Sequence, residues 1–320
     1  MPSVSVVIPS HQRRESLRRL LRALDAQSLP AEQFEVVVCL DGCTDGSDAM
    51  LASLRPSYAL RARELAGGGR AAACNEAIRA ARGELLVILD DDMEPGPRLL
   101  EVHLAAHRRA EERGERLVLM GAVPVRADGG TNPAARYVAG KFGSHLRKLA
   151  RVDHRLALRD FYTGNCSIRR DTIESVGLFN EGFRDYGNED LDLYVRLRRA
   201  RVTIRFDPDA EATQHYEKDI EALMRDGRSK GRTAVLLARL HPEVKGELQL
   251  GSWRRTPWRL RLPVALLLAV TPVVPSLPSR LSSLLKGVGR SDEGVGRLAF
   301  EVALAYAYWL GVRDAEHAAR

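Results

Sequence analysis

A run of five aliphatic residues, Leu85 to Leu89, ends abruptly in Asp90, Asp91 and Asp92. A short continuous apolar run of this kind predicts a strand that is buried on both faces, as in a parallel sheet. Three adjacent carboxylates repel one another, so they need either solvent or a neutralising cation. Carboxylate oxygens suit Mg²⁺ or Mn²⁺, and Mg²⁺ often joins protein carboxylates to substrate phosphates. The stretch therefore predicts either a metal and phosphate site at a strand end or an acidic turn in water.

The same combination of a buried strand and a polar end recurs in the first 125 residues. Strands are predicted at 4–9 and 34–40, and the second is followed by Asp41 and a turn sequence, Gly42 to Ser47. An amphipathic helix carrying Leu17 to Leu24 and a small-residue helix from Arg70 to Ala81 are predicted between the strands. Alternating strands and helices predict a parallel sheet whose ligands bind beyond the carboxyl ends of the strands. Asp41 and the three aspartates are expected at that edge.

The pattern is less regular in the middle of the chain. A helix is predicted near 97–112, a strand near 117–125, an irregular basic stretch over 131–159, a loop entering a short strand at 163–168, and a strand at 203–206. Asn188, Glu189 and Asp190 open a further predicted helix, where capping alone would explain acidic residues. His215 lies just beyond the last of these strands, and a single histidine is usually structural.

The end of the chain differs in composition. The basic, glycine-containing stretch from Arg225 to Arg232 suits a mobile anion-binding loop or an ordinary solvated turn. Residues 253–261 combine arginine with tryptophan, and the apolar run 262–277 is short for a membrane span and broken by prolines. We interpret 253–285 either as a membrane-surface element or as a helical appendage packed on the core or on a second subunit. A final helix is predicted at 298–312.

Charge and cysteine content narrow the class of partner and the compartment. The net charge of +7 favours an anionic partner, either nucleic acid, a phospholipid surface or a nucleotide diphosphate. Nucleic acid is not expected, because the arginines are dispersed over helix faces without a recognisable binding module. The four cysteines lack disulfide or zinc spacing and are interpreted as reduced thiols, and no leader precedes the first strand. We therefore expect a cytoplasmic protein, with a peripheral position on the cytoplasmic face of the inner membrane as the alternative.

Taken together, these motifs resemble the family 2 glycosyltransferases, which use nucleotide-sugar donors and have the GT-A fold. The resemblance covers roughly residues 3–240: Val4 to Pro9 is similar to the opening strand, Asp90 to Asp92 to the DxD motif, and Glu189 and Asp190 to the ED motif. It implies an α/β, Rossmann-like, mostly parallel twisted sheet flanked by helices. The implied domains are a catalytic domain, 1–240, with a donor half at 1–125 and an acceptor and base half at 126–240, and a C-terminal helical appendage at 241–320.

The resemblance also implies roles for individual residues. Asp190, beside Glu189, would be the catalytic base, and Asp92 with His215 would bind the divalent cation, Mn²⁺ or Mg²⁺. The implied acceptor-binding residues are Gly164, Asn165 and Tyr186. The implied donor-binding residues are Pro9, Ser10, Asp41, Gly68, Arg70, Asn75, Asp90, Asp91, Arg228, Lys230 and Arg232.

The chemistry of transfer agrees with these roles. A divalent cation would stabilise charge on the leaving diphosphate of a UDP-, GDP- or dTDP-type donor. A single carboxylate base without a nucleophilic partner implies single displacement with inversion at the anomeric carbon. The expected acceptor carries a hydroxyl group, and the expected setting is bacterial glycan, glycolipid or natural-product glycoside synthesis.

Three other functions are compatible with parts of the sequence. A sugar-nucleotide pyrophosphorylase should carry a glycine-rich basic signature after the first strand, where this chain has Pro9 to Arg13. A dinucleotide-binding dehydrogenase is disfavoured because its glycine-rich turn should follow the first strand, whereas Gly67 to Gly69 comes too late in the chain. A catalytically silent protein that binds sugar nucleotides or recruits a partner to a membrane remains the principal alternative.

Overall fold

The computed structural model describes residues 2–127, 132–250, 253, 256–288 and 293–318. The chain forms two compact units. Unit 1 comprises residues 1–124, 144–184 and 189–215, and unit 2 comprises 125–143, 185–188 and 216–320. This division differs from the expected boundary at residue 240, because residues 216–240 group with the C-terminal helices.

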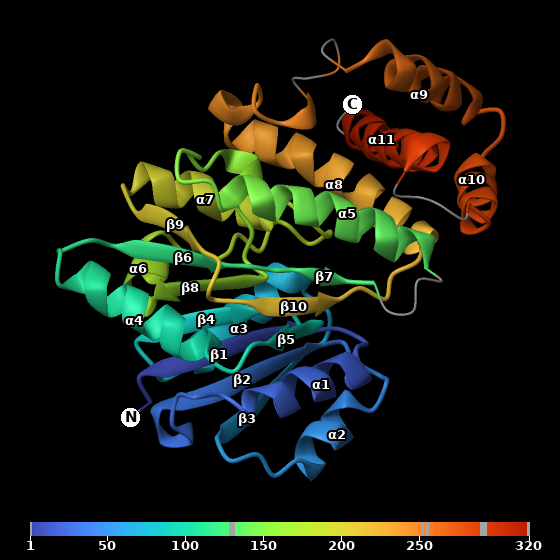
Figure 1. Ribbon diagram of the computed structural model, residues 1–320. Coiled ribbons are helices and arrows are strands. Elements are labelled where there is room, and N and C mark those ends of the chain that lie inside the picture. The colour runs from blue at the N-terminus through green and yellow to red at the C-terminus, as the bar shows by residue number, and fades with distance from the viewer. Residues whose placement is uncertain (1, 128–131, 251–252, 254–255, 289–292, 319–320) are drawn as a thin grey trace. The chain divides into compact units, whose positions relative to one another are not determined.

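Unit 1 is built on a seven-stranded sheet with the order β3-β2-β1-β4-β8-β6-β9 (Figure 1). Strand β8 runs antiparallel to β4 and β6, whereas the other neighbours are parallel. The predicted α/β class with a mostly parallel sheet is confirmed. The strands are β1 (Val4–Ser10), β2 (Phe34–Asp41), β3 (Ala59–Leu65), β4 (Leu85–Leu89), β6 (Leu117–Gly121), β8 (Asn165–Arg169) and β9 (Thr203–Asp207).

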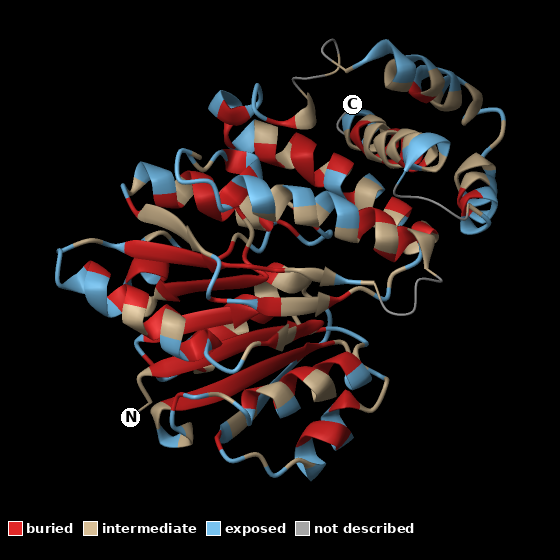
Figure 2. Ribbon diagram, in the orientation of Figure 1, coloured by how far each residue is buried: buried red, intermediate tan, exposed pale blue. Residues whose placement is uncertain are grey.

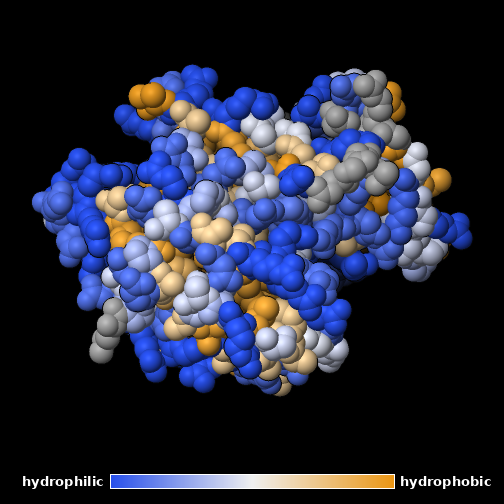
Figure 3. Space-filling model, turned by 60° about the horizontal axis from the view of Figure 1, so that its bottom comes forward, coloured by the Kyte–Doolittle hydropathy of each residue, from blue (hydrophilic) through white to orange (hydrophobic). Residues whose placement is uncertain are grey.

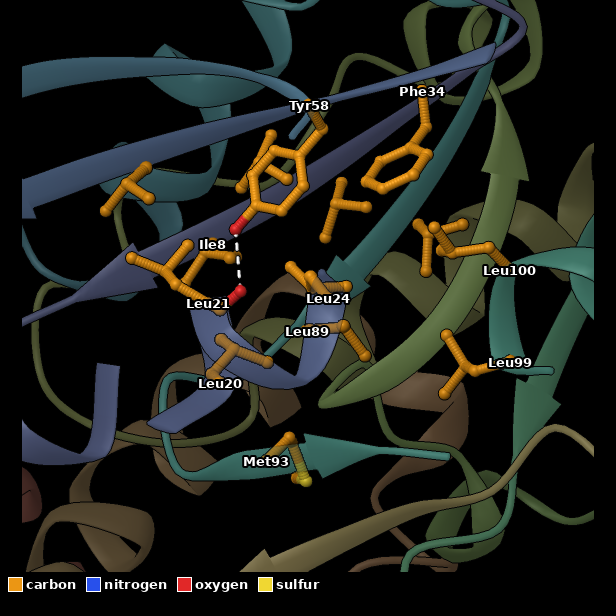
Figure 4. Close-up of a cluster of buried hydrophobic side chains, with 14 of the residues drawn as sticks. Ile8, Leu20, Leu21, Leu24, Phe34, Tyr58, Leu89, Met93, Leu99 and Leu100 are labelled. Carbon is orange, nitrogen blue, oxygen red and sulfur yellow. Dashed lines mark hydrogen bonds between the residues drawn. The ribbon is translucent and has the colours of Figure 1, made fainter. Parts of the chain in front are cut away.

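Helices pack on this sheet through their apolar faces. In α1 (Arg14–Leu24), the leucines at 17, 20, 21 and 24 recur at helical spacing and are buried with Val6 and Ile8 of β1. Figure 4 shows the cluster, in which the Tyr58 hydroxyl donates to the Leu21 carbonyl at 2.8 Å. The other helices of unit 1 are α2 (Ser47–Ser53), α3 (Arg70–Ala80), α4 (Leu99–Glu111), α6 (Arg170–Ser175) and α7 (Glu189–Arg199).

A short antiparallel pair, which the sequence analysis did not predict, lies beside the large sheet. Strands β5 (Met93–Pro95) and β10 (Ala212–His215) pair so that Met93 lies opposite Gln214. The His215 N–H donates to the Asp92 carbonyl at 2.9 Å. The pairing therefore joins two segments that are more than 100 residues apart in the sequence, next to the acidic stretch.

Unit 2 consists mainly of helices. They are α5 (Pro133–Leu149), whose residues up to Gly143 belong to this unit, α8 (Ile220–Leu240), α9 (Trp258–Val270), α10 (Leu277–Lys286) and α11 (Gly294–His317), and the short strand β7 is Val125–Arg126. The prediction of an irregular stretch at 131–159 is wrong for the residues that form α5. By length and composition alone, α11 would be able to cross a membrane, a test that the core helix of a soluble protein also passes.

The glycines of the basic stretch 225–232 pack two helices together. This stretch lies inside α8, so the predicted mobile loop is wrong. A Cβ atom on Gly231 would lie 2.0 Å from the Tyr308 carbonyl oxygen, and one on Gly311 would lie 1.8 Å from the Arg228 carbonyl oxygen. Glycine here permits close contact between α8 and α11 rather than a turn.

Polar residues dominate one face of the molecule, whereas the core strands are apolar. The face shown in Figure 3 is predominantly hydrophilic, with hydrophobic residues in smaller separate patches. The long apolar strands of the central sheet are buried instead, as the red strands in Figure 2 show.

Candidate functional site

The polar residues that follow β1, β2 and β4 lie at one edge of the sheet. Because β1 is parallel to both β2 and β4, the three strands end on the same side. Ser10, Asp41 and Asp90 to Asp92 stand at these ends. The predicted alignment of these residues at one sheet edge is confirmed.

Asp41 organises the glycine segment that leads into α3. Its two carboxylate oxygens accept the N–H groups of Gly68 at 2.7 Å and Gly69 at 2.8 Å. Hydrogen bonds to an ionised carboxylate are among the stronger ones in proteins. Gly69 has φ +82°, which favours glycine at this position. Each Asp41 oxygen keeps a second lone pair for a further donor, such as an N–H of a base.

Arg70, the first residue of α3, connects the two acidic motifs. Its Nη2 lies 2.7 Å from Asp90 Oδ1, and its Nη1 lies 3.3 Å from Glu189 Oε1. Burial lowers the pKa of Arg70, but the charges of Asp90 and Glu189 raise it, and the net direction is upward. A fixed cation therefore stands between stretches that are about 100 residues apart in the sequence.

Glu189 presents an unused acceptor at this point. Its side chain is buried, and its Oε2 has no hydrogen-bond partner among the described residues. A buried carboxylate oxygen without a partner is costly, so a bound hydroxyl group would stabilise it. Asp190, the next residue of α7, is half-buried. The two carboxylates of the predicted ED motif therefore lie at the helix start, one of them paired with Arg70.

Asp91 faces the end of β1. Its Oδ2 accepts the Ser10 hydroxyl at 2.8 Å and the His11 N–H at 3.4 Å. Burial raises the pKa of Asp91 to about 7, against an opposing effect of Arg13. This side chain therefore ties Ser10 and His11, at the end of β1, to the acidic stretch.

The predicted metal ligands Asp92 and His215 lie beside each other, since the His215 N–H donates to the Asp92 carbonyl. The His215 ring is hydrogen-bonded to the Glu94 carboxylate through Nε2, an arrangement that is common for metal-binding histidines. Gln214 Nε2 lies 3.2 Å from both Asp92 carboxylate oxygens. No group of three or more His, Cys, Asp or Glu side chains suited to a metal occurs among the described residues. A cation here would depend on oxygens of a bound ligand to complete its coordination.

The family follows from comparison with known proteins. Residues 5–177 match the model described as glycosyl transferase family 2, which is more than half of the chain. This chain belongs to glycosyl transferase family 2. Residues 144–219 also match the model described as the N-terminal domain of galactosyltransferase.

Individual relatives are more distant. The chain is 31% identical over 247 residues to the glycosyltransferase YfnE of Bacillus subtilis, which covers 63% of this chain and 62% of YfnE. It is 30% identical over 222 residues to validoxylamine A glucosyltransferase of Streptomyces hygroscopicus, which covers 62% of this chain and 51% of that protein. The chain thus spans between half and two thirds of these relatives.

Solved structures confirm the fold. The mannosyltransferase PcManGT of Pyrobaculum calidifontis, in complex with GDP-Man and Mn²⁺, superposes with a TM-score of 0.63 at 21% identity, covering 98% of this chain and 88% of that one. S. aureus TarS 1–349 in complex with UDP gives a TM-score of 0.54 at 17% identity, covering 100% and 92%. The GT-A fold predicted for this family 2 member is therefore the observed one.

Two predicted ligand-binding asparagines are structural. Asn165, predicted on the acceptor side, is fully buried, and its amide donates to the carbonyls of Ala122 and Ala210. Asn75, predicted on the donor side, donates to the Phe179 carbonyl and accepts its N–H, each at 2.9 Å. Both predictions are wrong, because the backbone uses these amides. Gly164 lies against the acidic stretch, since a Cβ there would lie 2.5 Å from Asp90 Oδ2.

A buried histidine network, which the sequence did not indicate, supports Asn165. His103 Nε2 lies 3.1 Å from Asn165 Oδ1, and the Ser167 hydroxyl lies 2.7 Å from His103 Nδ1 and 2.9 Å from His107 Nε2. Asn165 Oδ1 can only accept, so a neutral His103 donates to it from Nε2. His103 Nδ1 then accepts the proton of the Ser167 hydroxyl. The Ser167 oxygen in turn accepts the N–H of His107 Nε2. Burial lowers the pKa of each ring to about 4, so both rings are neutral near pH 7. The i, i+4 spacing of the histidines was the available signal.

The three predicted phosphate-binding cations lie on α8 in unit 2. Arg228 pairs with Asp314 at 2.6 Å, and Arg232 pairs with Asp185 at 2.9 Å. Lys230 lies with its Nζ 5.2 Å from the centre of the Tyr186 ring, and Lys218 lies 4.6 Å from the same ring. The Tyr186 ring is therefore close to two ammonium groups within unit 2. Donor binding by Arg228, Lys230 and Arg232, and acceptor binding by Tyr186, remain predictions.

Proposed function

We propose that this family 2 chain transfers a sugar from a nucleotide-diphosphate donor to an acceptor hydroxyl by single displacement with inversion. The observation that carries the proposal is the double ion pair of Arg70 with Asp90 and Glu189. It links the DxD-like stretch, which would hold the donor, to the ED-like stretch, which would hold the acceptor and base. A protein that only bound sugar nucleotides would not need the ED-like stretch to lie beside the DxD-like stretch.

In this proposal, each carboxylate has a separate task. Asp41 accepts a hydrogen bond from the base while holding Gly68 and Gly69, and Asp90 binds the ribose or the sugar. Asp190 removes the proton of the attacking hydroxyl, and the unpartnered Glu189 Oε2 binds the acceptor. The positive charge of Arg70 holds Asp90 and Glu189 in place, so that the donor and acceptor are bound beside each other.

Asp92 and His215 would hold a divalent cation. Carboxylate oxygen and imidazole nitrogen suit Mn²⁺, and the Glu94 carboxylate fixes the histidine ring. When bound, the cation would neutralise charge on the leaving diphosphate. The Mn²⁺ and GDP-Man of PcManGT, and the UDP of TarS, support a metal and a nucleotide-sugar donor, although these relatives share only the fold. We extend the proposal to a cytoplasmic location and to glycan, glycolipid or natural-product glycoside synthesis.

Replacing Asp190 by Asn tests the proposed reaction. Loss of the base should lower sugar transfer about 100-fold to 10,000-fold while leaving nucleotide affinity unchanged. The assay follows nucleoside diphosphate release from UDP-, GDP- and dTDP-sugars with a pool of hydroxyl acceptors, and calorimetry measures nucleotide affinity. The matched control is Asp171→Asn, an exposed aspartate near the start of α6. Full transfer by the Asp190 variant, or a product with retained configuration, would contradict the proposal.

A further inference from the structure

Helix α9 exposes a continuous apolar face. Trp258 is 71% exposed, Leu262 60% and Leu266 66%, and Val273 after the helix is 83% exposed. The alanines at 265 and 269 are exposed between them, and no charged residue interrupts the series from 262 to 273. The spacing of four residues places Trp258, Leu262 and Leu266 on one side of the helix. We call these three residues the α9 face; the exposed positions of α9 are pale blue in Figure 2.

The opposite side of α9 is apolar as well. Val264 is fully buried, and Leu267 and Leu268 pack against the cluster that contains Phe300 and Tyr306 of α11. Arg313 Nη1 donates to the Leu268 carbonyl at 2.7 Å, and the Thr271 and Tyr306 hydroxyls lie 2.7 Å apart. The helix is thus held by one side within unit 2. A helix that is apolar on all sides is normally buried in protein or in lipid.

The charge of the chain is concentrated in the same unit. Unit 1 has 29 Lys and Arg residues and 29 Asp and Glu residues, whereas unit 2 has 20 and 13, so the whole net charge of +7 belongs to unit 2. Arg259 is exposed at the start of α9, beside Trp258. An anionic surface would therefore complement this unit, whereas a second copy would bring like charges together.

We propose that unit 2 binds the surface of an anionic lipid bilayer, with the α9 face in the interface between headgroups and acyl chains. The helix has 13 residues, whereas a membrane span needs about 20, so it lies in the plane of the interface. Tryptophan is enriched at membrane interfaces, and basic residues attract anionic headgroups. This inference does not depend on the proposed reaction.

Vesicle binding of the full chain tests the inference. Cosedimentation should show binding to vesicles of phosphatidylglycerol and phosphatidylcholine in equal parts, and weaker binding to phosphatidylcholine alone or at high salt. Leu262→Glu/Leu266→Glu should weaken binding about tenfold or more. The matched control, Val152→Glu/Leu240→Glu, adds the same charge at two other exposed apolar positions and should bind like the unsubstituted chain.

Tryptophan fluorescence gives a second measurement on the folded protein. The chain has three tryptophans, and Trp253 and Trp309 are in mutual ring contact within the apolar cluster. Anionic vesicles should shift the emission of Trp258 to shorter wavelength, brominated lipids should quench it, and Trp258→Phe should abolish both effects. Equal vesicle binding by the α9-face and control variants would overturn the inference. So would a dimer in light scattering that the α9-face variant dissociates, with no vesicle binding, because the face would then be a subunit interface.

Discussion

At the scale of single residues, Arg70 holds the site together. It is 18% exposed and balances two carboxylates, of which Glu189 is 7% exposed. Partly buried carboxylates that lose their cation are left with an uncompensated charge, which costs more than the loss of an exposed ion pair. The positive charge is therefore needed both for folding of the site and for placing the two acidic motifs.

Replacing Arg70 by Ala should damage both stability and activity. We expect a loss of about 3 kcal/mol in unfolding free energy, because Asp90 and Glu189 lose their cation, and a fall of about 100-fold in kcat/KM. Denaturant titration and steady-state kinetics measure the two effects. The control is Arg79→Ala on the same helix, whose 3.2 Å pair with Glu181 is about half exposed and should change stability by less than about 1 kcal/mol. Equal effects of the two substitutions would contradict the role of Arg70.

The sequence predicted which carboxylates lie close together, but not that the side-chain amides of Asn75 and Asn165 bond to the backbone. Asp41 and Asp90 follow apolar runs, and the rule that parallel strands end at one edge was enough to bring them together. Asn75 and Asn165 are also polar and also follow a glycine, six residues and one residue later respectively. Their burial and their backbone partners depend on segments distant in the chain, which no local pattern reveals.

At the scale of helices and strands, prediction worked where an apolar run decided the element. The strands β1, β2 and β4 are such runs, with every residue buried in all three. Strand β3 was missed, because it is a charged edge strand that exists through its pairing with β2. Helix α8 was mistaken for a loop, because its glycines serve a contact with α11 that the sequence does not show.

Two buried histidines of α4, His103 and His107, bond to β8 and should make the stability of the protein depend on pH. Burial lowers the pKa of His103 and of His107 to about 4 in each case. The unfolded chain takes up these protons near pH 6.5, whereas the folded chain does not until about pH 4. Stability should therefore be unaffected above about pH 7 and should decrease between pH 6.5 and 4, by roughly 2–3 kcal/mol for each histidine at pH 4.

Denaturant titration from pH 4 to 8 measures this dependence. The variant His103→Gln/His107→Gln keeps polar side chains that do not titrate, so its stability should change less over this range. The control is His11→Gln, at an exposed position, which should follow the unsubstituted protein. Parallel pH curves for the double variant and the control would contradict the network of neutral histidines.

At the scale of the whole molecule, charge and site fall in different units. The strand-end site with its acidic motifs belongs to unit 1, which is neutral overall, and the basic excess belongs to unit 2. The sequence shows only the total of +7, because unit 2 collects residues from three separate segments. The fold therefore allows the excess positive charge to be assigned to unit 2, whereas composition alone allowed three kinds of anionic partner.

Ligand-dependent thermal stability tests the central claim most directly. The melting temperature is measured with UDP-, GDP- and dTDP-sugars, each with and without Mn²⁺, for the unsubstituted chain and for Asp92→Asn. A ligand at 100 times its Kd adds about 2.7 kcal/mol, which corresponds to a rise of about 5 °C or more. We expect such a rise for one nucleotide class, with Mn²⁺ only, and its loss in Asp92→Asn. No rise with any donor, or the same rise in the variant, would contradict metal-dependent binding of a sugar nucleotide at this site.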